Sequence, residues 1–203
     1  ARVGLTMRDL FVDATTPSMT TPEIVETYPY TAEDGTLLYE VVRYVPKAFR
    51  QRRPDGCNGW IWKLDDRTAT PPVTTPRVLL GLPELIDVTD VFIVEGEKDV
   101  RALQKLGLSA TTNAGGAGQW RDDYAQQLSR TGALRVNIIP DNDEPGQTHA
   151  ATVARSCHTA GIEARIVRLP NPRPKGDVSD YLDAGHTRAD LAALVTATVA
   201  LSQ

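Results

Sequence analysis

The sequence predicts an α/β fold: a mainly parallel sheet flanked by helices, preceded by a small antiparallel β module. Two observations predict it. Beyond residue 90, apolar runs with strand character alternate with stretches of helical character, which is the pattern of a parallel sheet with right-handed crossover connections. Between residues 28 and 64, short strand-like runs are separated by Asp34-Gly35 and Pro54-Asp55-Gly56, which are typical of hairpin turns.

Composition divides the chain of 203 residues into four expected segments. They are a lead-in rich in Thr, Ser and Pro (1–27), the small β module (28–64), a linker (65–89) and the α/β domain (90–203). The linker is expected because Pro71, Pro72 and Pro76 can neither donate to a strand ladder nor continue a helix.

The expected elements follow in chain order. In the β module, strand-like runs cover 28–30, 37–45, 48–53 and 59–64. In the α/β domain, predicted strands at 91–94, 109–112, 134–139 and 163–169 alternate with predicted helices at 98–106, 118–130, 145–160 and 188–201. Ligands of such parallel sheets bind where the strands end, at their carboxyl edge.

Charge and cysteine content exclude several classes of protein. With 22 basic and 26 acidic residues, the net charge of −4 argues against a general polyanion binder. Cys57 and Cys157 are too few for a disulfide framework, and with only 3 histidines they do not predict a four-ligand zinc site. No apolar run approaches the roughly 18 residues of a membrane helix, and the N-terminus lacks the layout of a signal peptide. We therefore expect a cytoplasmic protein without a membrane partner.

Acidic residues cluster where three of the predicted strands end. Because the carboxyl ends of parallel strands meet at one edge of a sheet, we expect these side chains to lie close together. Crowded carboxylates repel one another unless they are protonated or bound to a cation, and hard divalent cations prefer oxygen ligands. Mg²⁺ or Mn²⁺ is therefore the expected cofactor. The clustered acids are Glu95 and Asp99, Asp141 and Asp143, and Asp177 and Asp180.

The alternative for each of these acids is that it caps a helix N-terminus, where backbone N–H groups favour a carboxylate. For Glu95, Asp141 and Asp143 we favour metal chemistry over capping, because three clusters fall on one edge. Three neighbouring acids are interpreted as caps or surface charges: Glu97, Glu144 and Asp183.

The ordered set of motifs resembles the Toprim fold. The similarity is to the glutamate and DxD motifs of primases, topoisomerases and several nucleases. It is carried by Glu95 within the run VEGEKD, then by Asp141-Asn142-Asp143, and then by Asp177 and Asp180. The resemblance covers about residues 90–200, and VEGEKD, TTNAGGA, PDNDEPG and KGDVSDYL are most similar to primases and primase-helicases of phages and mobile elements.

The resemblance implies roles for individual acids. In the family, the glutamate and the DxD acids bind catalytic divalent metal, which corresponds here to Glu95, Asp141 and Asp143. It also implies a catalytic role for Asp99 and further metal ligands at two positions, Asp177 and Asp180.

The resemblance extends upstream. Residues 28–64 resemble the small module that precedes Toprim in these primases, and residues 4–11 resemble the tail of their zinc-binding module. It thus implies an excised polymerase domain, with an upstream zinc module and a replicative helicase supplied by the parent protein or in trans. The sequence itself contains no Walker A motif.

Four residues are candidates for binding the phosphates of a nucleotide. Lys175 lies in a Pro/Gly loop, where a mobile cation can close over a triphosphate. Gly115 and Gly116 follow a strand and precede a helix, so their backbone N–H groups either cradle phosphate or serve tight packing. Lys98 either contacts phosphate or balances its acidic neighbours.

A basic strip without acidic residues is expected to bind a single-stranded DNA template by pairing with its phosphates. Phe49 lies within the strip. Trp60 and Trp62 are expected to form the core of the β module rather than to stack on bases, because so small a sheet needs apolar bulk. The basic strip consists of Arg43, Lys47, Arg50, Arg52 and Arg53.

The residues and the resemblance together predict template-directed nucleotidyl transfer, that is, primer synthesis from nucleoside triphosphates on single-stranded DNA. Two alternatives stay open. A Toprim nuclease would use the same acids to activate water on DNA or RNA, and a non-catalytic nucleic-acid-binding module would use them for structure. A topoisomerase is set aside, because the sequence offers no visible partner domain for a nucleophilic tyrosine.

Overall fold

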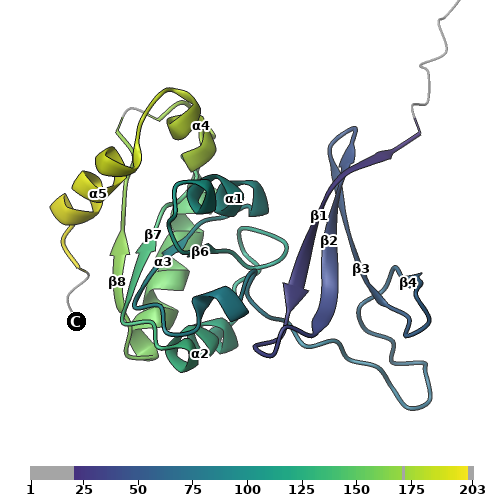
Figure 1. Ribbon diagram of the computed structural model, residues 1–203. Coiled ribbons are helices and arrows are strands. Elements are labelled where there is room, and N and C mark those ends of the chain that lie inside the picture. The colour runs from purple at the N-terminus through teal and green to yellow at the C-terminus, as the bar shows by residue number, and fades with distance from the viewer. Residues whose placement is uncertain (1–20, 171, 201–203) are drawn as a thin grey trace, which may run out of the picture.

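An antiparallel sheet precedes the α/β domain, and the computed structural model describes residues 21–170 and 172–200. The zinc-module-like segment 4–11 lies outside the described residues. The strands pair in the order β1-β2-β3-β4, and Figure 1 shows this sheet standing beside the α/β domain. They are β1 (Glu23–Thr31), β2 (Leu37–Val45), β3 (Ala48–Pro54) and β4 (Trp60–Ile61).

Strand β1 begins earlier than the sequence predicts. Its pairing with β2 runs from Thr31 opposite Leu37 to Glu23 opposite Val45, so β2 provides a backbone partner along the whole of β1. The residues before Tyr28 include the β-branched Ile24, Val25 and Thr27, which favour a strand, so the local sequence also carried a signal for the longer β1. At the other edge, β4 is only two residues long instead of spanning 59–64.

One face of the antiparallel sheet is buried. Tyr28 and Tyr30 on β1, and Tyr39 and Val41 on β2, are each at most 3% exposed, as the two-residue period of a strand requires. Tyr30 lies opposite Tyr39 in register, and their rings stack with centroids 4.6 Å apart. These residues give the sheet a tyrosine-rich face that needs a partner surface.

The α/β domain contains a parallel sheet in the order β6-β5-β7-β8, which confirms the predicted fold class. Its strands are β5 (Asp90–Ile93), β6 (Ala110–Thr111), β7 (Arg135–Ile138) and β8 (Glu163–Ile166). Its helices are α1 (Glu97–Lys105), α2 (Asp122–Thr131), α3 (Glu144–Thr159), α4 (Val178–Asp183) and α5 (Arg188–Ala197). Side chains of α1, α4 and α5 join one apolar cluster and those of α2 and α3 join the other, so the sheet is covered on both faces.

Helices α2 and α4 differ from the prediction. Helix α2 begins at Asp122 instead of residue 118. Gly118 adopts a left-handed φ of 79°, and the N-cap residue Arg121 is extended, so neither belongs to a right-handed helix. Helix α4 was not predicted. It is a short helix with a capping box, in which Asp180 N donates to Asp177 Oδ1 at 2.7 Å and Asp177 N donates to Asp180 Oδ2 at 3.2 Å.

The second half of the segment expected to be a linker, 65–89, takes part in the core. Leu80 N donates to Thr112 O at 3.0 Å beside β6, and a short 3₁₀ helix follows at Pro83–Leu85. The prolines that predicted a linker end at Pro76, and an apolar run follows them. Four leucines of this run are buried: Leu79, Leu80, Leu82 and Leu85.

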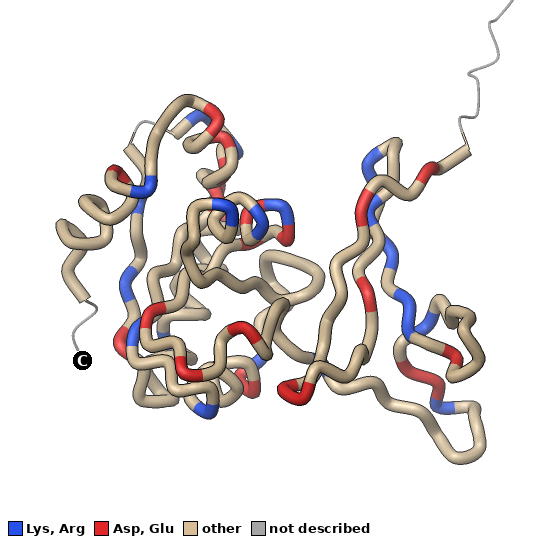
Figure 2. The backbone as a smooth tube through the Cα atoms, viewed as in Figure 1, with Lys and Arg blue, Asp and Glu red and all other residues tan. Residues whose placement is uncertain are grey.

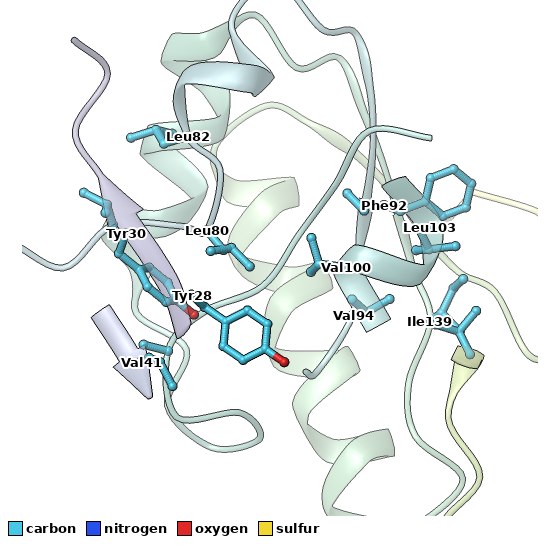
Figure 3. Close-up of a cluster of buried hydrophobic side chains, with 14 of the residues drawn as sticks. Tyr28, Tyr30, Val41, Leu80, Leu82, Phe92, Val94, Val100, Leu103 and Ile139 are labelled. Carbon is cyan, nitrogen blue, oxygen red and sulfur yellow. The ribbon is translucent and has the colours of Figure 1, made fainter. Parts of the chain in front are cut away.

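The tyrosine-rich face and the α/β domain share one apolar cluster. Figure 3 shows Tyr28 and Tyr30 in this cluster together with Leu80, Val94 and Val100. A buried hydrogen bond crosses the same boundary, because the Tyr30 hydroxyl donates to Glu97 Oε1 at 3.0 Å. The sheet is therefore fixed against α1. Within the two described ranges, no helix is both long and apolar enough to cross a membrane.

Truncation of Leu80 tests whether the 78–85 run is structural. Leu80→Ala should lower the free energy of unfolding by about 2–5 kcal/mol, because it removes a buried side chain from the shared cluster. The matched control, Leu134→Ala, removes the same atoms from a side chain that is 64% exposed and should change it by less than about 0.5 kcal/mol. Urea titrations of both variants measure the difference. Equally small losses would show that the run is only a linker.

Candidate functional site

A cavity of about 1010 Å³ lies between the antiparallel sheet and the carboxyl edge of the parallel sheet. Both units contribute to its walls. From the antiparallel sheet and the residues after it come Arg43, Lys47, Phe49, Arg50, Trp62 and Lys63. From the α/β domain come Glu95, Lys98, Asp99, Gly115, Gly116, Asp141 and Asp177.

Glu95 and Asp141 meet at this edge because β5 and β7 are neighbours in the sheet. Glu95 lies two residues beyond the end of β5, and the Asp141 N–H donates to Glu95 Oε1 at 3.1 Å. The contact requires Gly146, since a Cβ added there would lie 2.4 Å from Glu95 Oε1 and 2.6 Å from Asp141 O. Gly146 is a residue that the sequence analysis did not single out, although it closes the PDNDEPG motif.

The carboxylates of the cavity disfavour one another's ionised forms. Burial and then the charge of Glu95 raise the pKa of Asp141 to about 7, with smaller contributions from Asp99, Asp177 and Asp143. Burial and the charges of Asp143 and Asp99 raise the pKa of Glu95, against a hydrogen bond that lowers it. A bound cation would reverse these shifts, because it favours the ionised forms.

The donor chemistry fits Mg²⁺ or Mn²⁺, which prefer hard carboxylate oxygens. The conformation described is not preassembled for a metal: within residues 21–170 and 172–200, no group of three Asp, Glu, His or Cys side chains is arranged to hold one. Asp143 is the N-cap of α3, where its Oδ1 accepts a hydrogen bond from Gly146 N at 2.8 Å. Helix capping and metal binding were alternatives for Asp143 in the sequence analysis. The structure shows the capping role, and the same carboxylate remains a candidate metal ligand.

The remaining acids have structural partners of different kinds. Asp99 is buried and accepts hydrogen bonds from the backbone N–H and the hydroxyl of Ser179, which ties α1 to α4. Asp177 caps α4 and lies 3.6 Å from Lys98 Nζ, so that this lysine balances acidic charge.

Asp180 does not line the large cavity. It forms an ion pair with Arg173 and lines a second cavity of about 540 Å³ behind α4. Asp177 and Asp180 were expected as metal ligands from the acidic cluster after the fourth strand and from the Toprim resemblance. In the structure, the α4 capping box uses both carboxylates at the start of a helix.

Of the four residues expected to bind phosphate, Lys98, Gly115 and Gly116 line the large cavity. Gly115 and Gly116 have φ values of 90° and 67°, which glycine adopts without strain. Lys175 is not among the residues that line this cavity. Its backbone N–H donates to Asn142 O at 3.0 Å, and Asn142 N donates to Gly176 O at 3.0 Å, so its loop is fastened to the DxD segment.

The basic strip divides into two groups. Figure 2 shows basic residues along the antiparallel sheet, and Arg43, Lys47 and Arg50 line the cavity. Arg52 does not. Its guanidinium lies 2.7 Å from the Glu40 carboxylate and 3.9 Å from the ring centroid of Trp60, and its side chain is only 14% exposed.

Register explains why Arg52 differs from its neighbours. It lies directly opposite Glu40 in the β2–β3 pair, a partner that the local sequence of the strip does not reveal. Arg53, the last arginine of the strip, is also absent from the cavity walls, and its Nε donates to Lys63 O at 3.2 Å.

Two aromatic side chains of the cavity are half exposed. Phe49 is 49% and Trp62 is 47% exposed, although Trp62 was expected in the core of the β module. Trp60 is only partly buried, and the Arg52 guanidinium lies 3.9 Å from its ring centroid and 5.3 Å from that of Trp62. The cavity therefore combines carboxylates on one wall with cations and exposed aromatic rings on the other.

Comparison with known proteins identifies relatives of the α/β domain. Residues 92–182 match the family described as Toprim-like. Over 105 residues the chain is 30% identical to a DNA primase of Chlamydia pneumoniae, an alignment that covers 50% of this chain but only 18% of that protein. The chain thus spans a small part of the length of this relative.

Two further proteins extend the comparison. The Gene 57 protein of Mycobacterium phage D29 is 31% identical over 111 residues, which cover 53% of this chain and 68% of that protein. The zinc-binding and RNA polymerase domains of the Aquifex aeolicus primase superpose with a TM-score of 0.63 at 19% identity, over 86% of this chain and 40% of that one. Together these findings place the chain in one family with the phage Gene 57 protein and identify its α/β domain as a Toprim domain with DNA primase homologues.

Proposed function

We propose that this chain catalyses template-directed nucleotidyl transfer, the joining of nucleoside triphosphates into a primer on single-stranded DNA. The observation that carries the proposal is one cavity with two unlike walls. Carboxylates suited to divalent cations face a surface of cations and exposed aromatic rings. Nucleotidyl transfer needs both, because the metal and the nucleic acid must meet at the reacting phosphate.

Glu95, Asp141 and Asp143 are the proposed metal ligands. When bound, Mg²⁺ or Mn²⁺ supplies charge neutralisation at the transferred phosphoryl group and lowers the pKa of the attacking hydroxyl. Asp177 lines the same cavity and is a further candidate ligand. Asp99 acts on the site indirectly in this proposal, by fixing α1 against α4 through Ser179.

The reaction requires no protein nucleophile. The 3′-hydroxyl oxygen of the primer attacks the α-phosphorus, the bond to the β-phosphate oxygen breaks, and pyrophosphate leaves with the bonding electrons. The hydroxyl proton passes to solvent. The protein's contribution is to position the reactants and to stabilise charge.

The template is proposed to bind the opposite wall. Arg43, Lys47 and Arg50 supply positive charge for phosphates, and Phe49 and Trp62 offer exposed rings on which bases can stack. Lys98 and the glycine turn are the proposed contacts for the nucleotide's phosphates. An upstream zinc module and a replicative helicase are proposed as partners in the parent protein or in trans.

One assay separates this proposal from the alternatives. The chain is mixed with a primed single-stranded template, labelled nucleotides and Mn²⁺, and the labelled products are resolved by length. Elongation of the primer supports nucleotidyl transfer. Shortening of the DNA would instead indicate a nuclease, and retention of DNA without chemistry would indicate a binding module; either result would contradict the proposal.

Asp141→Asn tests the metal site. We expect primer extension to fall at least about a hundredfold, the order of effect of removing one electrostatic group from an active site. At pH 8 and without metal, the melting temperature of the variant should equal or exceed that of the wild type. The reason is that the folded state disfavours ionised Asp141, whose pKa is raised.

Thermal melting with and without Mn²⁺ completes this test. The wild-type midpoint should rise with Mn²⁺, because a ligand bound only by the native state stabilises it, and the variant should respond less. Asp183→Asn, at an exposed position in α4, is the matched control and should behave as the wild type. An equal Mn²⁺ response in all three proteins would rule out Asp141 as a ligand.

Arg50→Ala and Arg52→Ala form a matched pair for the basic strip. Arg50→Ala should reduce the slope of log K for single-stranded DNA binding against log salt concentration by about 0.7 per lost phosphate contact. It should leave the free energy of unfolding unchanged. Arg52→Ala should leave this slope unchanged and lower the free energy of unfolding by about 1–3 kcal/mol, because it leaves Glu40 largely buried without its partner. Titrations of a labelled single-stranded oligonucleotide with each variant, across a salt series, measure the slopes. Equal slopes for both variants would contradict the division of the strip.

A further inference from the structure

The glycine turn at 114–118 is held from within by a buried asparagine. Asn113 is fully buried, and its side-chain amide donates to Gly116 O at 3.0 Å and to Ala114 O at 3.4 Å. Just before it, the Thr112 hydroxyl donates to Glu95 O at 3.0 Å. The start of the turn is therefore tied to the segment that carries a proposed metal ligand.

A histidine from another helix holds the far end of the turn. Gly118 N donates to Nδ1 of His149, which lies in α3 and is only 5% exposed. Burial lowers the pKa of His149, so the imidazole is neutral. Because Nδ1 accepts, the ring proton is assigned to Nε2.

This end of the turn carries two buried donors without acceptors. Among the described residues, neither His149 Nε2 nor the indole Nε1 of Trp120 has a hydrogen-bond partner. The two rings lie edge to face with centroids 6.4 Å apart. An unpaired buried donor lowers the free energy of unfolding by about 1–3 kcal/mol, so packing alone does not explain a histidine and a tryptophan at these positions. Phenylalanine or leucine would fill such a position without that cost.

The turn leaves backbone donors free. Gly116 N donates to Asn113 O and Gly118 N to His149, whereas the N–H groups of Gly115 and Ala117 donate to no atom of the residues that the structure describes. Successive N–H groups in a turn with left-handed glycines form a concavity that binds anions. Gly115 lines the cavity of the proposed metal site.

We propose that His149 is a positioning residue for the triphosphate of the incoming nucleotide: by accepting the Gly118 hydrogen bond, it fixes the glycine turn so that the Gly115 and Ala117 N–H groups receive phosphate oxygens. The inference rests on the proposed function, since a triphosphate is the substrate of that reaction. His149 lies in the helix that Asp143 caps, so the turn and the DxD motif are positioned by one element.

The test compares two amides at position 149. The side-chain oxygen of asparagine can occupy the place of Nδ1, whereas that of glutamine reaches the place of Nε2, so only His149→Asn preserves the acceptor for Gly118. Inorganic triphosphate with Mg²⁺ is the probe, measured by calorimetry. We expect about tenfold weaker binding for His149→Gln, the loss of about one hydrogen bond, and a change within about twofold for His149→Asn.

A control and a kinetic readout separate positioning from stability. His158→Asn, at an exposed site of the same helix, should match the wild type. In primer extension, His149→Gln should raise the KM for nucleotides about tenfold with kcat and the KM for primed template nearly unchanged. Equal losses in both His149 variants, or none in either, would overturn the inference.

Hydrogen exchange in the wild-type chain gives a test that needs no variant. The Gly118 amide should be protected without ligand, and the Gly115 and Ala117 amides should become protected when triphosphate and Mg²⁺ are added. Rapid exchange at Gly118, or no change at Gly115, would refute the inference. Triphosphate binding that depends on His149 without any primer extension would leave it standing and contradict the proposed function instead.

Discussion

The site depends on the confinement of Glu95 and Asp141 at one sheet edge. Strands β5 and β7 are neighbours in the sheet and place the two residues side by side. Gly146 lets the start of α3 approach closely enough for the Asp141 N–H to donate to Glu95 Oε1. Burial is the largest cause that raises the pKa of both carboxyl groups. The charge of Glu95 adds to the effect on Asp141, and the charges of Asp143 and Asp99 add to the effect on Glu95. A fold that keeps such a pair gains little stability from it, which is typical of a site retained for binding a cation.

The second wall of the cavity exists because the antiparallel sheet is packed firmly against α1. The stacked Tyr30 and Tyr39 rings enter the same apolar cluster as Leu80 and Val100, and the Tyr30 hydroxyl reaches Glu97. Glu97, interpreted from the sequence as a cap or surface charge, thus joins the two units. With this boundary fixed, Arg43, Lys47 and Arg50 of the basic strip line the same cavity as the carboxylates, as the proposed reaction between a strand and a triphosphate requires.

Strand and helix order followed from the sequence because apolar periodicity is local, and the convergence of Glu95 and Asp141 followed because parallel strands end at one edge. The roles that depend on partners distant in sequence did not follow. Arg52 is held by Glu40 through strand register, His149 contacts a turn 31 residues away, and Asp180 closes a short helix. The capping-box spacing of Asp177 and Asp180 was a signal that would have found α4.

The direct measurement of the central claim is the position of a metal in crystals of the wild-type chain grown with Mn²⁺. An anomalous difference map collected near the manganese edge locates the ion independently of activity. We expect a peak in the large cavity, in contact with carboxylate oxygens of Glu95 and Asp141. A peak elsewhere, or none at a Mn²⁺ concentration that raises the melting temperature, would contradict it.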